Sequence, residues 1–232
     1  MLERYSLTST AEILQKHLPK VALTEGYTPR FNAAPSQLLP VITNESPTGF
    51  SFFYWGTAPK WSNNKAISQK LINAAKEELM VKRTYKKALT RHRCLVPADG
   101  FYCWKNIGKK SRIPYRIILS QANPFYMAGL WEEYQDESDD LIHTFSIVTI
   151  PSNDLVSPVS SRMPAILTLQ SGSLWLENSS TDDLMDMLQP FPSENMAMYT
   201  VSPMIDSKQH DLPSMVEPAP AIDQFGNFTL FN

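Results

Sequence analysis

Short apolar runs alternate along this chain with segments that are rich in proline and polar residues. Runs of this kind, bounded by turn-forming residues, are typical of β-strands. The runs that predict strands are 38–42, 49–55, 94–97, 101–104, 114–119, 125–131, 144–150 and 163–167. Ala98-Asp99-Gly100 separates two of them and predicts a hairpin between 94–97 and 101–104. The tail closes on another strand-like run at 225–231.

Helical periodicity is confined to a few short segments. Ser9-Thr10-Ala11-Glu12 has the form of a capping box, and apolar residues then recur on one helical face up to Pro19. Further helices are predicted in part of the basic stretch after 71–74, at 171–177, and at 181–188 with Ser180 or Thr181 as its cap. Strands dominate, so we expect an α+β fold that is rich in β-structure, with a few short helices.

The composition suits a globular protein with a sizeable core. The chain has 232 residues, of which 43% are hydrophobic, and we expect one domain over 1–232. No apolar run is long enough for a transmembrane helix, and the first residues lack the apolar core of a signal peptide. Two cysteines do not make a disulfide framework, so a reducing cytoplasm is the expected compartment.

The charge is divided unevenly along the chain. Residues 1–130 hold 19 Lys/Arg against 7 Asp/Glu, a net of +12, and residues 131–232 hold 2 against 16, a net of −14. The basic half is densest between Lys60 and Arg93. A focused basic stretch can bind a polyanion whatever the total charge, although a solvated helix face attracted to the acidic half explains the same pattern.

Several ordered motifs resemble those of one family, the SRAP (SOS response-associated peptidase) proteins, which process abasic sites in DNA. The motifs are Arg30-Phe31-Asn32-Ala33-Ala34-Pro35, Trp55-Gly56-Thr57-Ala58-Pro59-Lys60-Trp61, Leu71-Ile72-Asn73-Ala74, Arg93 to Trp104 (RCLVPADGFYCW), Ala128-Gly129-Leu130-Trp131-Glu132, and Arg162-Met163-Pro164 followed by Ala165-Ile166-Leu167. Because they cover nearly the whole chain in the family's order, chance similarity is a poor explanation. The resemblance implies a strongly curved mixed sheet.

The resemblance also implies a specific chemistry. In the family, an N-terminal cysteine condenses through its α-amine with the aldehyde of a ring-opened abasic site, and its thiol closes a thiazolidine. A glutamate and a histidine transfer the protons, and an asparagine helps to hold the site. A 1,2-aminothiol is bifunctional towards an aldehyde, which is why this covalent catalysis needs both groups on one residue.

Three of these four roles have no matching residue in this chain. Leu2 stands at the cysteine position, Cys103 at the glutamate position and Ser160 at the histidine position, whereas the asparagine remains as Asn73. The arginine that follows this asparagine in the family is Ala75 here. Leucine has no nucleophilic atom, and its bulk predicts that the initiator methionine is retained. We therefore expect no cross-link by the family mechanism.

Part of the DNA-binding groove matches the family. The resemblance implies DNA contacts at Arg4, Asn32, Trp55, Trp61, Asn73 and Arg162. Arginine–phosphate contacts and base stacking are the usual means of holding single strands. For Arg162 a structural ion pair is an equal alternative, and the two tryptophans fit a core or groove wall better than a free stacking surface.

The remaining cysteines, histidines and glycines do not indicate a further functional site. Cys103 lacks the base or cation that activates a thiol, so an inert thiol is favoured over a substitute nucleophile, and Cys94 lies in a predicted core strand. A disulfide between them is conceivable across the predicted hairpin but does not fit a reducing compartment. His17, His92, His143 and His210 lie far apart without metal-ligand spacing, and no phosphate-cradling glycine loop is present. We expect neither a metal nor a cofactor.

These observations predict a degenerate SRAP-like protein that binds single-stranded or junction DNA in a DNA damage response. The alternatives are an interaction or regulatory module that no longer binds DNA, which the acidic half favours, and a residual enzyme with altered chemistry at Asn73, Cys103 and Ser160. If the scaffold is intact, these three residues and the N-terminus converge on one groove, which Leu2 or Met1 partly fills.

Overall fold

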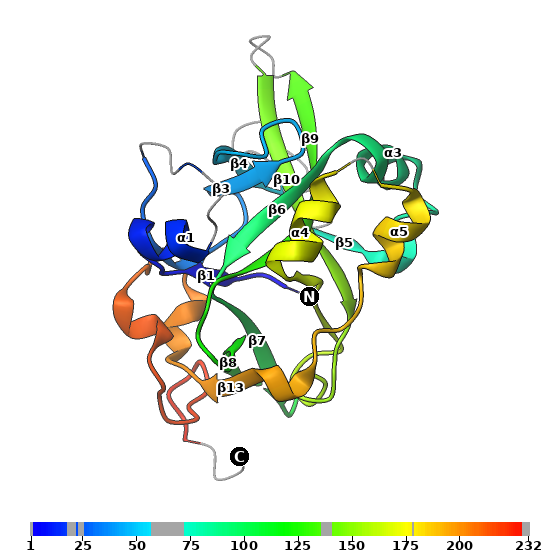
Figure 1. Ribbon diagram of the computed structural model, residues 1–232. Coiled ribbons are helices and arrows are strands. Elements are labelled where there is room, and N and C mark those ends of the chain that lie inside the picture. The colour runs from blue at the N-terminus through cyan, green and yellow to red at the C-terminus, as the bar shows by residue number, and fades with distance from the viewer. Residues whose placement is uncertain are drawn as a thin grey trace.

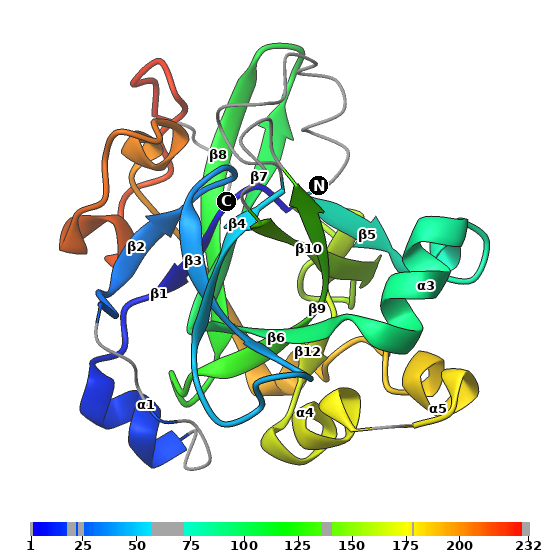
Figure 2. The same ribbon diagram turned by 90° about the horizontal axis from the view of Figure 1, so that it is seen from above.

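The fold consists of two antiparallel-rich sheets, one of which closes on itself. The computed structural model describes residues 2–17, 22, 26–56, 72–135, 141–177 and 179–228. In the larger sheet β10 pairs with β4, β4 with β3, β3 with β6, β6 with β9, and β9 again with β10. Figure 2 looks into this ring of strands. Closure leaves these strands without a free edge, and it confirms the predicted strongly curved, β-rich α+β fold.

The larger sheet has eight strands in the described residues. They are β3 (Leu38–Thr43), β4 (Ser51–Trp55), β5 (Asn73–Ala75), β6 (Arg93–Ala98), β9 (Phe125–Gln135), β10 (Leu141–Pro151), β11 (Arg162–Pro164) and β12 (Ile166–Leu167). The smaller sheet has the order β13-β8-β7-β1-β2. Its strands are β1 (Tyr5–Leu7), β2 (Arg30–Ala33), β7 (Gly100–Ile107), β8 (Ser111–Leu119) and β13 (Met196–Thr200).

Short helices surround the sheets (Figure 1). They are α1 (Ala11–His17), α3 (Arg83–Arg91), α4 (Leu169–Leu176), α5 (Thr181–Asp186), and the 3₁₀ turns η1 (Lys76–Glu78), η2 (Ser193–Asn195), η3 (Pro203–Asp206) and η4 (Pro213–Val216). The helices predicted before Pro19, at 171–177 and at 181–188 are present as α1, α4 and α5, the last of which ends at Asp186, and Ser180 caps α5 as predicted. Among the described helices, none has the length and hydropathy of a membrane span.

The predicted capping box is shifted by one residue. Thr10 is the cap of α1, because its side-chain oxygen accepts from the backbone N–H of Ile13 at 3.5 Å and its carbonyl accepts from Leu14. Ser9 instead donates its hydroxyl to the Asp99 carboxylate, 3.3 Å away. The sequence pattern predicted Ser9 as the cap, but its hydroxyl binds the distant Asp99 carboxylate instead.

The predicted hairpin around Asp99 is wrong. β6 pairs with β3 and β9 in the larger sheet, whereas β7 pairs with β1 and β8 in the smaller one. The chain thus passes from one sheet to the other at Asp99. Gly100 is needed directly after the crossing, because a Cβ there would lie 2.7 Å from Nε of Arg116.

A buried ion pair fixes this crossing point. The Asp99 carboxylate accepts from the side chains of Ser6 and Thr8, both at 2.8 Å, and from the backbone N–H groups of Thr8 and Ser9. Arg116 on β8 donates to its Oδ1 at 3.0 Å. Burial alone would lower the pKa of Arg116, but the adjacent carboxylate raises it above its ordinary value. Asp99 therefore fixes the N-terminal strand β1 at the point where the chain crosses from the larger sheet to the smaller one.

The core is continuous between the two sheets. Its buried members include Phe101 on β7 and Trp55, Phe145 and Ile147 on the larger sheet, together with Trp175 on α4. Tyr5 of β1 contacts Trp55 edge-on, with ring centroids 5.3 Å apart. Burial of aromatic side chains on this scale supplies much of the folding free energy.

The predicted strand at 225–231 is not observed where the chain is described. Residues 224–226 form a turn in which Gly226 has a φ of +87°, and Ile222 and Phe228 make an isolated antiparallel bridge. The Asp223 carboxylate accepts from the backbone N–H groups of Phe225 and Asn227 and so closes the turn. The rest of the predicted strand, 229–231, lies outside the described residues.

We predict that Asp99→Ala lowers the free energy of unfolding by roughly 3–5 kcal/mol, because it leaves the Arg116 guanidinium buried without its partner. Urea unfolding followed by circular dichroism measures the change. Asp186→Asn, at an exposed position on α5, serves as the control and should stay within about 0.5 kcal/mol of the parent chain. A similar loss in both variants would contradict a special role for Asp99.

Candidate functional site

The N-terminal segment reaches the larger sheet at Asn73. The Asn73 amide donates to the Leu2 carbonyl at 2.8 Å, and the Tyr85 hydroxyl donates to the Asn73 carbonyl at 3.4 Å. Both ribbon views (Figure 1 and Figure 2) place the N-terminus beside β5, which begins at Asn73. Asn73 therefore positions the start of the chain.

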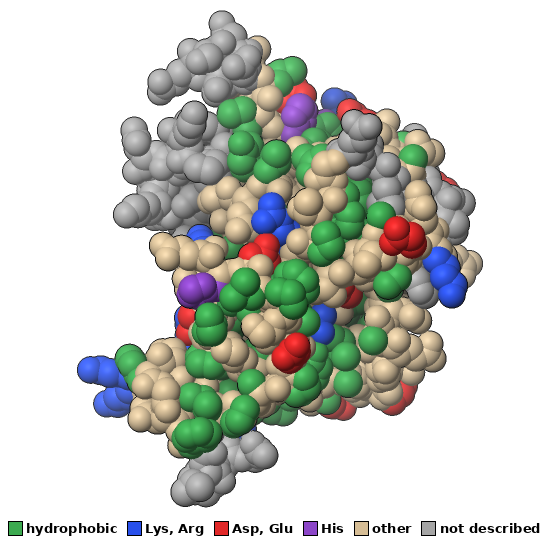
Figure 3. Space-filling view, turned by 90° about the vertical axis from the view of Figure 1, so that its left-hand side faces the viewer, with side chains coloured by type: hydrophobic (Ala, Val, Ile, Leu, Met, Phe, Trp, Pro, Cys, Tyr) green, Lys and Arg blue, Asp and Glu red, His purple; other side chains and the backbone are tan. Residues whose placement is uncertain are grey.

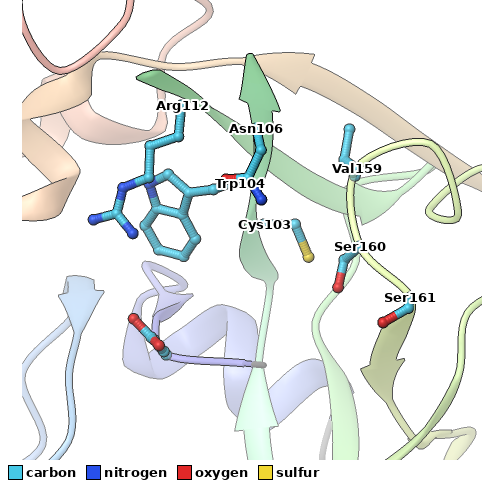
Figure 4. Close-up of a pocket in the computed structure, with 8 residues that line it drawn as sticks. Cys103, Trp104, Asn106, Arg112, Val159, Ser160 and Ser161 are labelled. Carbon is cyan, nitrogen blue, oxygen red and sulfur yellow. The ribbon is translucent and has the colours of Figure 1, made fainter. Parts of the chain in front are cut away.

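Cys103 and Ser160 meet at a pocket next to this segment. Its volume is about 300 Å³, and its lining residues are Glu3, Cys103, Trp104, Asn106, Arg112, Val159, Ser160 and Ser161. In Figure 4, Cys103 from β7 and Ser160 from the loop between β10 and β11 lie side by side, with the Cys103 sulfur pointing towards the Ser160 hydroxyl. The four positions that the resemblance singled out thus lie together, although they are distant in sequence.

Leu2 is buried, not open to this pocket. Its side chain is only 3% exposed and belongs to the hydrophobic core. Burial of a leucine side chain is favourable by about 1.5–3 kcal/mol relative to exposure. Leu2 does not line the pocket, so the prediction that it partly fills the groove is not confirmed, and Met1 lies outside the described residues.

The thiol of Cys103 is held in its neutral form. Burial raises its pKa to about 12, although a hydrogen bond with Ser160 and the positive N-terminus act in the opposite direction. Burial likewise raises the pKa of the Cys94 thiol. Both thiols are free, and they lie in strands of different sheets. Since the thiolate is the nucleophile, neither cysteine is activated in this environment.

Ser160 is also committed to the fold. Its hydroxyl donates to the Arg162 carbonyl at 2.7 Å, and its own carbonyl accepts from Ser152. These bonds shape the loop that enters β11. A hydroxyl has no pKa near neutrality, so Ser160 cannot replace a histidine in proton transfer.

The two arginines with predicted phosphate contacts already have partners within the chain. Arg4 is only 6% exposed and donates to the carbonyls of Glu3 and Asp206, at 2.7 and 3.2 Å. Arg162 forms a bidentate ion pair with Glu77, with N–O distances of 2.9 and 3.3 Å, and also donates to Thr149. The structural ion pair that was an alternative for Arg162 is therefore present.

Asn32 and Trp55 lie beneath the surface, with no exposed area. The Asn32 amide donates to the carbonyls of Ser207 and His210, at 2.9 and 2.8 Å, and the Trp55 indole donates to the Ile72 carbonyl at 2.8 Å. A DNA strand can touch only exposed atoms, so neither side chain contacts DNA directly in this conformation. Trp61 lies outside the described residues.

Only some of the cations in the basic stretch are exposed to solvent. Helix α3 buries Tyr85, Ala88 and Leu89 and exposes its cations to solvent: Arg83, Lys86, Lys87 and Arg91. Arg93, in contrast, is buried and donates to the carbonyls of Leu89, Trp175 and Glu177. Lys60, Lys65 and Lys70 lie outside the described residues.

Sequence patterns did not identify several residues of the pocket. Trp104, Asn106 and Arg112 line it from β7 and β8, and the antiparallel register pairs Asn106 with Arg112 directly. The Gly108 turn between the two strands, with a φ of +70°, was the available signal for this hairpin. Among the described residues, no group of His, Cys, Asp or Glu is arranged to hold a metal ion.

We predict that iodoacetamide does not alkylate Cys103 or Cys94 in the folded protein at pH 8, where a thiol with a pKa of about 12 is thiolate only about once in ten thousand molecules. Mass spectrometry should find two modified cysteines only after denaturation. A Ser157→Cys variant, at an exposed position, checks that the reagent is active. Rapid native labelling of Cys103 would show that its thiol is activated.

Comparisons with known proteins agree with this geometry. The family model for the SOS response associated peptidase (SRAP) matches residues 1–208. The abasic site processing protein YoqW of Bacillus subtilis is 36% identical over 222 residues, which span 94% of this chain and 99% of that protein. The abasic site processing protein HMCES of Rattus norvegicus is 26% identical over 263 residues, covering 94% of this chain and 74% of that one.

A solved structure has the same fold. The crystal structure of a protein from Bacteroides thetaiotaomicron matches with a TM-score of 0.77 and 26% sequence identity, over 93% of this chain and 99% of that one. The family match extends over most of the chain and includes the N-terminal segment, Asn73, Cys103 and Ser160. The chain belongs to the SRAP family.

Proposed function

We propose that this chain is a single-domain, cytoplasmic SRAP-family protein that binds single-stranded or junction DNA in the response to DNA damage, without forming the thiazolidine cross-link. One observation carries the proposal: Glu3 of the N-terminal segment, Cys103 and Ser160 line one pocket, and Asn73 binds the Leu2 carbonyl of the same segment, but none of them supplies an activated nucleophile. The relatives named as abasic site processing proteins support a role in DNA damage.

The loss of chemistry follows from the three replaced residues. Leu2 supplies no thiol to close a ring, and its side chain is packed in the core. Cys103 and Ser160 stand where the family has an acid and a base, but neither titrates near neutral pH in this pocket. A Schiff base with an aldehyde would still need a free amine, and without a thiol it would stay reversible.

Binding of DNA would use the cations that remain accessible. Arg162 is 28% exposed at its side chain, and α3 adds further cations that are exposed to solvent. The face that carries α1 and the C-terminal turns, in contrast, shows apolar and neutral side chains with few cations (Figure 3). In this proposal Arg4, Asn32 and Trp55 support the groove, Asn73 lines it, and Trp61, outside the described residues, is a further DNA contact.

A second candidate is an interaction module that no longer binds DNA. It is favoured by the internal pairing of Arg4 with the Asp206 carbonyl and of Arg162 with Glu77, because a phosphate would have to displace these partners. An enzyme with altered chemistry at Asn73, Cys103 and Ser160 is disfavoured by the neutral Cys103 thiol.

Titration with single-stranded DNA separates these functions. We predict weak binding at low salt, with log K falling against log salt by about 0.7 for each phosphate contact. Arg162→Gln should weaken binding for every sequence alike and make this slope shallower, whereas Lys16→Gln, on the α1 face, should have little effect. Oligonucleotides with and without an abasic site measure any preference. No binding at low salt would reject the proposal in favour of the interaction module.

A further inference from the structure

Three cations gather where the N-terminal segment passes the C-terminal turn η3. Arg4 is flanked by Arg112, and the positive charge of each acts on the other. Lys208 lies close enough for the charges of Arg4 and Glu3 to act on its pKa. Two carboxylates, Glu3 and Asp206, stand among them. Like charges at this density repel one another, so the cluster favours an additional anion.

Arg112 is the cation that faces the pocket. Its guanidinium lies over the Trp104 ring, 5.1 Å from the ring centroid, and Figure 4 shows the two side chains together at the opposite end of the pocket from Cys103 and Ser160. Stacking on an indole fixes the plane of a guanidinium and leaves its N–H groups for a bidentate acceptor. Arg112 is thus oriented in advance for an oxyanion.

Asp206 forms an ion pair with this guanidinium. Its Oδ1 lies 2.8 Å from Nη2 of Arg112, and both side chains are partly exposed, at 21% and 40%. The backbone carbonyl of Asp206 accepts from Arg4, so the residue is held in place by its main chain whatever its side chain does. The carboxylate can therefore leave Arg112 without loss of the local fold.

Lys208 has no carboxylate partner within the part of the chain that the structure describes. Burial, and then the charge of Arg4, lower its pKa below the ordinary value, and the charge of Glu3 acts in the opposite direction. It follows Asp206 by two residues in the chain. An anion bound at Arg112 would lie among Arg112, Lys208 and Arg4.

We propose that Arg112 forms a phosphate subsite for DNA at the pocket, that the charge of nearby Lys208 adds to it, and that Asp206 is its internal competitor. This inference rests on the proposed DNA binding and adds the residues that set its strength. A phosphodiester offers two non-bridging oxygens to the guanidinium, as the Asp206 carboxylate now does with its own oxygen. DNA binding would then require exchange of Asp206 for phosphate, which explains how a groove with few free cations can still take a polyanion.

The test is a set of titrations with an unmodified single-stranded oligonucleotide. Asp206→Asn frees Arg112 and should tighten binding about two- to fivefold at low salt, the range that corresponds to a partly exposed ion pair. One more phosphate contact should steepen the salt slope by about 0.7. Asp186→Asn removes the same charge on α5 and measures the effect of net charge alone.

Arg112 supplies the second half of the test. Arg112→Gln should weaken binding, Arg112→Lys should restore part of it, and in an Asp206→Asn/Arg112→Gln double variant the gain from Asp206→Asn should disappear. Thermal unfolding of each variant checks the fold, and Asp206→Ser repeats the test if the asparagine variant is unstable. Equal behaviour of Asp206→Asn and Asp186→Asn, or a gain that persists without Arg112, would overturn the subsite.

The same titrations separate this inference from the proposed function. If the parent chain binds DNA and the subsite variants do not change affinity or slope, the subsite is rejected and the DNA-binding proposal stands. If the parent chain fails to bind and Asp206→Asn binds, the competitor role is supported, while DNA binding by the natural chain is rejected. If none binds at low salt, both fall.

Discussion

The buried carboxylate of Asp99 is the interaction on which the arrangement of this protein depends. It lies where the chain leaves the closed larger sheet for the smaller one, and its ligands come from the N-terminal strand and from Arg116. A charge at this depth is tolerated only when it is paired and fully hydrogen-bonded. Because Ser6, Thr8 and Ser9 supply those bonds, β1 is fixed against β7. The residues just before β1 then reach Asn73 and the pocket.

The residues that replace the family's reactive groups suit one another physically. A glutamate at position 103 would be a buried charge and would need a cation or a protonated histidine beside it. Cys103 and Ser160 remove the acid and the base together, so neither leaves an uncompensated charge behind. Leu2 gains from burial where a reactive cysteine would have to stay accessible. In the proposed function, the pocket therefore lacks the family's nucleophile while its other lining residues remain.

Much of the fold could be predicted from local pattern, but the partners of each strand could not. Helix α5 and its Ser180 cap follow from short-range signals. The runs before and after Asp99 look like a hairpin because apolar periodicity does not tell in which sheet a strand lies. The Ser9 capping box failed for a similar reason, since its competitor is 90 residues away. Convergence of Cys103 and Ser160 was predicted only through the resemblance. The pairing of Arg112 with Asp206, 94 residues apart, had no sequence signal.

The central claim is that the geometry of the SRAP site is retained, while the residues that would carry out its cross-linking chemistry are replaced. The most direct test restores the chemistry: a Leu2→Cys, Glu3→Gly, Cys103→Glu, Ser160→His variant, with Met1 removed, is incubated with abasic single-stranded DNA beside the parent chain and run on a denaturing gel. The account predicts a heat-resistant shifted band for the variant, weakened by Ala75, and none for the parent chain. A heat-resistant band from the parent chain, or none from a folded variant that binds DNA, would contradict it.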